Sequence, residues 1–517
     1  MNSYVERPIA PSLPPESMIQ ILKHLENDIP SLHSCVLVNR HWCITSVPRL
    51  WFEPFTSKLS ENSILSLLQT YFRCLKYDQD KISLSNNLPL PQRITTTKRS
   101  PFFKYASFLK SLNTRLLGKY VSLWINSSTT SEDKGNVTKM MLRALYKLFI
   151  ESGAKLDSLT LDVSAGSMDI AVEISLIKRN LNFISNIRKL VCIFSNFSSS
   201  EVLFNLSELW NELPNICKRI RILDVDANDM HWTSGQTLVN LIESQKELSN
   251  VKFRSFGSRV TSAVATLAKK SETLTSLEFE CIDFRKVSLD GLEHCTKLET
   301  IRFIGGKDCD IETFRPLIKA KCKIRTLELI EISDYESVLP LLEKVGWSLE
   351  HLIINPIKNS LVEALPRYCP NITYLNISIA SLFISHLLLL VSGCQLEYLV
   401  IHSNSIEDTE IILNEMGKVV PPSLHYLELL MPLTSDQLNT FLMHCRAPLK
   451  KLVINSYPRI FLTDSHIDSI KRFAIRKGTL KYVNLGIGGL HLDFDSLPIN
   501  GDGSLKFLSL DDIVVKY

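Results

Sequence analysis

From residue 156 onward, the sequence repeats one short pattern, apolar-x-x-apolar-x-apolar, in which x is any residue. Fourteen copies follow one another at a mean spacing of about 27 residues, with helix-like stretches such as SAVATLAKK and LNTFLMHC between them. One strand and one helix cannot bury their own apolar faces, so neighbouring copies must stack and share a continuous core. The first apolar positions are Leu156, Ile187, Ile220, Leu248, Leu274, Leu298, Ile324, Leu349, Ile372, Leu396, Leu424, Leu449, Leu480 and Leu505.

A strand and a helix repeated at this spacing resemble the leucine-rich repeat. The resemblance implies an α/β fold, a solenoid with a parallel β-sheet on its concave face and helices on its convex face. We expect about 14 irregular units over residues 156–517.

Cysteines stand shortly before several copies, which resembles the cysteine-containing subclass of these repeats. We interpret them as small buried residues at the turn from helix to strand. The alternative, a zinc site, is not expected, because thiols a full repeat apart lack the short spacing of zinc ligands. We therefore predict no metal and no cofactor. These cysteines are Cys217, Cys295, Cys322, Cys369, Cys394 and Cys445.

Ahead of the repeats, residues 13–51 read LPPESMIQILKHLENDIPSLHSCVLVNRHWCITSVPRLW and predict three short helices. Pro14 suits the first turn of a helix, where a missing N–H costs nothing. Leu22 and Leu25 belong to an apolar stripe at helical spacing. Three such helices bury too little surface to be stable alone. The segment is therefore either a cap for the chain that follows or a module that docks on a partner.

The order LP-x-E, then V-N-R-x-W, then LW resembles the F-box, the motif by which substrate receptors join the adaptor of a cullin–RING ubiquitin ligase. The resemblance implies a three-helix F-box over residues 10–55 that binds a SKP-type adaptor and, through it, a cullin–RING core. An F-box ahead of such degenerate repeats resembles F-box proteins of fungal type. The residues implied to bind the adaptor are Leu13, Pro14, Glu16, Ile21, Leu22, Leu25, Leu32, Val38, Asn39, Trp42, Leu50 and Trp51.

Residues 56–155 are expected to connect the F-box to the repeats and to cap the apolar end of the solenoid. Periodicity predicts a helix over 60–77, helix followed by strand over 102–125, and another helix over about 137–151. The stretch 78–101 lacks periodicity and is predicted to be a linker.

Strand side chains alternate, so the third and fifth residues of each copy should point to the concave face and the fourth and sixth to the core. At the fifth position, five consecutive copies carry charges of alternating sign, which predicts solvated cross-strand pairs. At the third position, the last six copies carry mainly aromatic residues, which either stiffen the sheet by stacking or anchor a bound target. The charged row is Asp224, Lys252, Glu278, Arg302 and Glu328, and the candidate target-binding row is Tyr374, Tyr398, Tyr426, Lys451, Tyr482 and Phe507.

The composition indicates which classes of partner and which cellular compartment to expect. A net charge of +4 among 517 residues gives no electrostatic case for binding nucleic acid or a membrane. No apolar signal segment is visible at the N-terminus, and the 12 cysteines form no CxxC pair, which favours reduced thiols. We expect a cytoplasmic or nuclear protein.

The sequence contains no phosphate-binding GxxxxGK[ST], no HExxH and no nucleophile elbow, so we expect a protein that is not an enzyme. The F-box resemblance implies the substrate-recognition subunit of an SCF-type ligase, whose repeats bind a protein target for ubiquitination and proteasomal degradation. The alternative is an interaction scaffold that binds the adaptor outside a ligase. A remoter alternative, a repeat-type regulator of a small GTPase, is disfavoured by the F-box.

Overall fold

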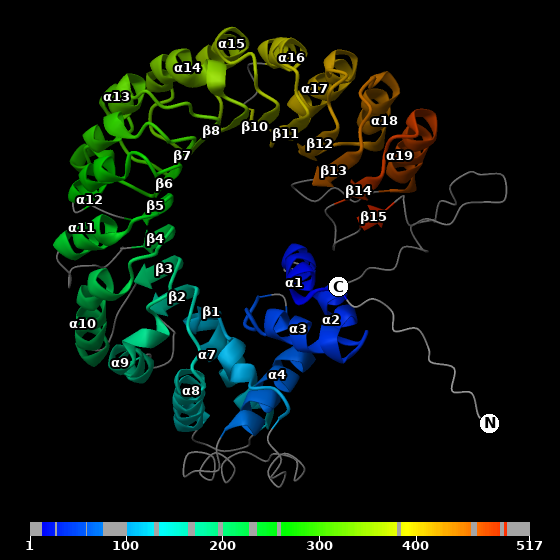
Figure 1. Ribbon diagram of the computed structural model, residues 1–517. Helices are drawn as coiled ribbons and strands as arrows, with labels where there is room; N and C mark the ends of the chain where they lie inside the picture. Colours follow the sequence, from blue (N-terminus) through cyan, green and yellow to red (C-terminus); the bar gives the residue numbers. More distant parts are fainter. Residues whose placement is uncertain are drawn as a thin grey trace, which may run out of the picture. The chain divides into compact units, whose positions relative to one another are not determined.

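Figure 1 shows a computed structural model of the protein. The chain forms two compact units, Met1–Leu248 and Ser249–Tyr517. This division does not test the domain boundaries predicted at residues 55 and 155, which stay predictions. The residues that the structure describes are 13–25, 28–57, 59–75, 101–128, 134–163, 171–194, 200–226, 235–255, 260–379, 384–455, 463–485 and 491–493.

Unit 1 starts with the predicted trio of short helices and continues into helix–strand repeats. Its elements are α1 (Pro15–His24), α2 (Ile29–Val36), α3 (Arg40–Leu50), α4 (Glu61–Cys74), η1 (Tyr105–Phe108), β1 (Ser111–Asn113), α7 (Thr114–Ser128), α8 (Lys134–Glu151), β2 (Ser158–Val163), α9 (Ala171–Arg179), η2 (Leu181–Phe183), β3 (Lys189–Phe194), α10 (Ser200–Ile216), β4 (Ile222–Asp226) and α11 (Gly235–Ser244).

Polar side chains cap the N-termini of α2 and α3. Asp28 accepts the N–H of Ser31 at 3.1 Å, which satisfies a free donor at the start of α2. Asn39 accepts the N–H groups of His41 and Trp42 at 2.9 and 3.0 Å and caps α3 in the same way. The asparagine of the V-N-R-x-W motif therefore has a local structural role.

An aromatic cluster packs these helices onto α4 and α8. Tyr71 of α4 is fully buried, and its ring lies 5.1 Å from the ring of Trp51, 5.2 Å from Phe149 and 6.0 Å from Phe55. Each of these rings brings a large apolar area to one contact. The end of the F-box-like segment therefore shares one core with the helices that follow it.

Residues 101–128 differ from the prediction, which placed a helix before a strand. Only the short 3₁₀ turn η1 precedes the strand β1, and the long helix α7 follows the strand directly. β1 pairs in parallel with β2, opposite Ser158 to Thr160. The sheet of unit 1 therefore begins ahead of residue 156, where the sequence pattern begins.

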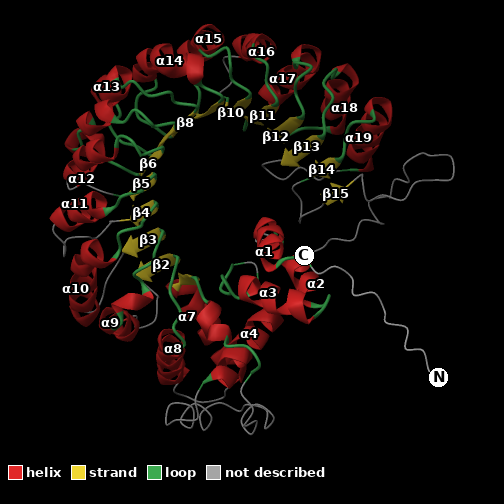
Figure 2. Cartoon of the chain, viewed as in Figure 1, coloured by secondary structure: helices red, strands yellow, loops and turns green. Residues whose placement is uncertain are grey.

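Unit 2 repeats a strand and a helix or 3₁₀ turn, and Figure 2 shows the strands on one side and the helices on the other. Its elements are β5 (Asn250–Arg254), α12 (Val260–Leu267), η4 (Ala268–Lys270), β6 (Ser276–Glu280), η5 (Phe284–Lys286), η6 (Asp290–His294), β7 (Thr300–Ile304), α13 (Ile311–Lys319), β8 (Thr326–Ile330), η7 (Glu336–Val338), α14 (Leu339–Val345), η8 (Gly346–Ser348), β9 (His351–Asn355), α15 (Asn359–Tyr368), β10 (Tyr374–Ser378), α16 (Ile384–Gly393), β11 (Tyr398–His402), α17 (Ile406–Val419), β12 (Tyr426–Leu430), α18 (Ser435–His444), β13 (Lys451–Asn455), α19 (Asp464–Lys477), β14 (Tyr482–Asn484) and β15 (His491–Asp493).

The strands pair in chain order. In unit 1, β1 to β4 are parallel, and in unit 2, β5 to β14 are parallel while β15 is antiparallel to β14. Strands β2 to β14 coincide with the first thirteen predicted copies. The copy that begins at Leu505 lies outside the described residues. The fold is the predicted leucine-rich-repeat solenoid.

The predicted alternation along the strands is confirmed. Ile301 and Phe303 of β7, the fourth and sixth residues of their copy, are fully buried, while Arg302 between them is half-buried on the concave face. The phenylalanines Phe253, Phe279 and Phe303 stack along the core of consecutive strands. Each copy therefore adds one layer to a shared core.

Of the cysteines ahead of the repeats, all but the half-buried Cys322 are buried. The thiol of Cys217 lies 3.4 Å from the Ile184 carbonyl of the preceding repeat, and burial raises its pKa to about 12. This confirms the structural interpretation. In the described part of the chain there is no group of three or more potential metal ligands, and no helix is long and apolar enough to span a bilayer.

Candidate interaction surfaces

The F-box-like helices leave a set of large apolar side chains exposed. Among the predicted adaptor-binding residues, Leu13 is 45%, Ile21 40% and Val38 61% exposed. Pro14, Glu16 and Asn39 are also exposed. Sequence reasoning missed four further members of this set, although Leu37 directly precedes the motif residue Val38. These are Ile19, Ile29, Leu37 and Ile44.

Other predicted adaptor-binding residues lie inside unit 1. Leu22 and Leu32 are fully buried, so in this conformation they pack the helices against one another. Leu25, Trp42, Leu50 and Trp51 are half-buried. Whether these residues contact an adaptor stays a prediction. The exposed residues of the preceding paragraph could bind a partner without any rearrangement of the helices.

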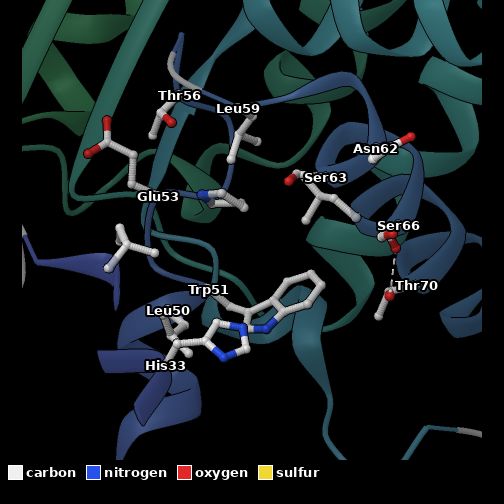
Figure 3. A pocket seen from close by; sticks show the side chains of 13 residues that line it. His33, Leu50, Trp51, Glu53, Thr56, Leu59, Asn62, Ser63, Ser66 and Thr70 are labelled. Atoms are coloured by element: carbon white, nitrogen blue, oxygen red, sulfur yellow. Dashed lines mark hydrogen bonds between the residues drawn. The ribbon is translucent and has the colours of Figure 1, made fainter. Parts of the chain in front are cut away.

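Trp51 has close neighbours within unit 1. Its ring lies 4.3 Å from that of Tyr105 and 5.1 Å from that of Tyr71. On its other side it lines a pocket of about 510 Å³ between the end of α3 and α4 (Figure 3), together with apolar residues and several hydroxyl groups. The lining also includes His33, Leu50, Glu53, Thr56, Leu59, Asn62, Ser63, Ser66 and Thr70.

On the concave face of unit 2, the predicted aromatic row forms one continuous column. Strand register places Tyr374, Tyr398, Tyr426, Lys451 and Tyr482 side by side on β10 to β14. The ring centroids of the first pair lie 6.1 Å apart and those of the next pair 5.6 Å apart. The remaining member of the predicted row, Phe507, lies outside the described residues.

The column is longer than predicted at its β9 end. His351, paired in register with Tyr374, stacks on it with ring centroids 5.4 Å apart and an interplanar angle of 11°. At the other end, the ammonium of Lys451 lies 5.2 Å from the ring centroid of Tyr426 and 4.6 Å from that of Tyr482. The column therefore already holds one cation between two tyrosine rings.

A carboxylate that sequence reasoning missed lies beside the column. The hydroxyl of Tyr426 donates to Oε2 of Glu428 at 2.7 Å, and the amide of Asn455 donates to Oε1 at 3.3 Å. Burial, and then this hydrogen bond, raise the pKa of Tyr426. Burial lowers the pKa of the nearby His402.

The charged row gives the predicted cross-strand pairs on unit 2. Glu278 pairs with Lys252 on one side and with Arg302 at 3.8 Å on the other, and Arg302 pairs with Glu328 at 2.6 Å. These side chains are 16–31% exposed. The fifth member of the predicted row, Asp224, lies on β4 in unit 1.

Comparison with known proteins identifies the N-terminal segment. A family model described as F-box-like matches residues 10–57, so an F-box-like domain precedes the repeats. No curated protein matches the sequence.

Solved structures with leucine-rich repeats are similar at low identity. A crystal structure of the yeast Rad7 and Elc1 complex is 14% identical, with a TM-score of 0.33, over 54% of this chain and 82% of that one. An internalin from Listeria monocytogenes is 14% identical, with a TM-score of 0.28, over 63% and 86%. A TLR13–ssRNA13 complex is 14% identical, with a TM-score of 0.29, over 64% and 49%. Because these TM-scores are low, the fold assignment rests on this chain's own strands and repeats.

Proposed function

We propose that this chain, with an F-box-like domain ahead of leucine-rich repeats, is the substrate-recognition subunit of an SCF-type cullin–RING ubiquitin ligase. The exposed face of the F-box-like domain binds a SKP-type adaptor and, through it, the cullin–RING core. The concave face of unit 2 binds the protein that is to be ubiquitinated and degraded. The chain transfers no ubiquitin itself and works in the cytosol or the nucleus.

The observation that carries the proposal is that one part of the F-box-like domain exposes apolar side chains while its end is packed against the following helices. The helices α1 to α3 and the turn between α2 and α3 present exposed apolar residues, and in that turn Leu37 is 80% and Val38 61% exposed. The end of the domain, with Trp51 and Phe55, is packed into unit 1. One side is therefore left for a partner, because soluble proteins rarely expose several large apolar side chains together.

A receptor that does not transfer ubiquitin must hold its target in a fixed place. Proximity catalysis depends on orientation, and a displacement of about 1 Å can lower a rate by about 100-fold. The Lys110 and Ser111 N–H groups donate to the Phe52 carbonyl at 2.9 and 3.0 Å, and the Tyr120 hydroxyl donates to the Thr56 carbonyl. These bonds fasten the F-box-like domain to β1 and α7, as a rigid adaptor-binding end requires.

The test is reconstitution of the full-length chain with purified adaptor and cullin. Val38→Glu should weaken adaptor binding at least tenfold, because it puts a charge into an apolar contact. Leu389→Glu is the matched control, since Leu389 is 65% exposed on α16 and should leave binding unchanged. Trp51→Ala is less suitable because it also removes the packing against Tyr71.

Three outcomes separate the alternatives. Capture of both adaptor and cullin by the wild-type chain, lost with Val38→Glu only, supports the receptor. Capture of the adaptor without the cullin favours a scaffold that works outside a ligase. Failure of the wild-type chain to bind the adaptor overturns the proposal.

A further inference from the structure

The concave surface of strands β11 to β13 differs electrostatically from that of strands β5 to β8. Over β5 to β8, each carboxylate in the charged row is paired with lysine or arginine. Glu428 on β12 instead has only neutral hydrogen-bond partners in the described part of the chain, Tyr426 and Asn455. This surface therefore carries a carboxylate that forms no ion pair with a cation in the described part of the chain.

The surroundings of Glu428 restrict its access to water. In register beside it, Val400 on β11 and Val453 on β13 are only 4% and 5% exposed. An ion pair formed between such apolar neighbours is stronger than one in open solvent, provided that the carboxylate is hydrogen-bonded and aligned. The bonds from Tyr426 and Asn455 supply that alignment, one to each oxygen. Each oxygen keeps a lone pair for a further donor.

Tyr398 on β11, in register with Tyr426 and so diagonal to Glu428, is 43% exposed and offers an aromatic ring to a bound side chain. The chain already shows that the column favours cations, because the Lys451 ammonium lies between the rings of Tyr426 and Tyr482. Burial lowers the pKa of His402 on β11, which disfavours its cationic form, and the charge of Glu428 opposes this shift. An aromatic surface beside an aligned carboxylate is complementary to a guanidinium or an ammonium.

We propose, on the basis of the proposed receptor function, that the target segment bound here carries an arginine or lysine whose cation pairs with Glu428. The apolar stem of that side chain lies over Tyr398, and its donors approach the free lone pairs of the carboxylate. Arginine should be preferred because its planar fork can donate two hydrogen bonds to one carboxylate. An acidic or phosphorylated segment would instead have to use Lys451 and would be repelled by Glu428.

The experiment selects random twelve-residue peptides, displayed on phage, against the full chain in complex with the adaptor. The selected peptides should be enriched in arginine or lysine. The strongest of them, made as a labelled synthetic peptide, should bind at least tenfold more weakly to Glu428→Gln, and its affinity for the wild type should fall as salt is raised. Glu410→Gln, a change of an exposed glutamate on α17, should leave the affinity unchanged.

A second variant guards against a folding defect in Glu428→Gln. Tyr426→Phe keeps the ring but loses the bond to Glu428, and we expect a three- to tenfold loss of peptide affinity with adaptor binding unchanged. Enrichment of acidic or phosphorylated peptides, or the absence of any enrichment, overturns the inference. Because the adaptor is bound throughout the selection, these outcomes do not contradict the proposed receptor function. That function is contradicted only if the wild-type chain fails to bind the adaptor.

Discussion

The carbonyl oxygen of Phe52 accepts two hydrogen bonds from the next segment of unit 1, from the N–H of Lys110 at 2.9 Å and from that of Ser111 at 3.0 Å. The same paired bonds recur between consecutive repeats. The carbonyl of Lys110 accepts from Asp157 and Ser158 at 2.8 and 3.0 Å. The end of the F-box-like domain therefore occupies the place of a preceding repeat in the hydrogen-bond ladder.

The packing behind this ladder can be tested at Tyr71. Tyr71→Ala should lower the free energy of unfolding by about 3–5 kcal/mol, because the buried ring fills the space among three other aromatic rings. Tyr71→Phe should be neutral or stabilising by about 1 kcal/mol, since the buried hydroxyl has no hydrogen-bond partner in the described chain. Urea unfolding followed by tryptophan fluorescence measures both. Equal losses in the two variants would show that the hydroxyl, not the ring, matters.

Much of the fold could be predicted from the sequence because the strands carry a strict pattern. In β2 to β14, the fourth and sixth positions are apolar, and the structure places a strand at each of these copies. β1 was missed because Ser111–Asn113 has three residues and a single apolar side chain, too few for a pattern. It is fixed by the carbonyl of Phe52 and by pairing with β2, neither of which is visible in the local sequence.

The candidate surfaces were only partly predictable, for a different reason. The row from Tyr374 to Tyr482 follows from the spacing of the repeats. The motif that resembles an F-box gives no indication that Leu22 and Leu32 are buried while Leu37 and Val38 are exposed, because that depends on how α1 to α3 pack. The hydrogen bond from Asn455 to Glu428 joins residues at different positions of two neighbouring copies. The sequence comparison aligned only equal positions of the copies, so it did not pair these two residues.

The charged row predicts a stability effect at Glu278. Glu278→Gln should cost about 1 kcal/mol, since Glu278 pairs with Lys252 and Arg302 across two strands and is 17% exposed. Glu278→Lys should cost more, because it places three cations side by side. The effect should shrink at high salt, as urea unfolding at low and high NaCl will show. Glu410→Gln serves as the surface control, and an equal loss in that variant would argue against the cross-strand pairs.

The cysteines should differ sharply in reactivity. Cys281 is exposed, so iodoacetamide at pH 8 should modify it first. Burial raises the pKa of Cys295 to about 11 and that of Cys369 to about 12, so these thiols should react only after unfolding. Mass spectrometry of timed digests measures the order. Cys281→Ser should remove the fast site, and rapid labelling of Cys369 in the folded protein would contradict its burial.

The last prediction concerns pH and the start of α19. Burial lowers the pKa of His466 below its usual 6.5, and the neighbouring charge of Asp436 opposes the shift in part. Nδ1 accepts the N–H of Thr463 at 3.1 Å, which a protonated ring nitrogen cannot do. The unfolded chain therefore binds more protons at this site than the folded one at pH values between the two pKa values.

It follows that stability is fully present above pH 6.5 and is lost as the pH falls through the folded pKa of His466. The melting temperature should be lower at pH 5.5 than at pH 7.5, a range in which most carboxylates stay ionised. The control is His466→Gln, because Gln437 accepts the N–H of Thr434 in the same way at the start of α18. The fall in melting temperature should be smaller in that variant, and an equal fall in both proteins would assign the pH dependence to other groups, such as His402.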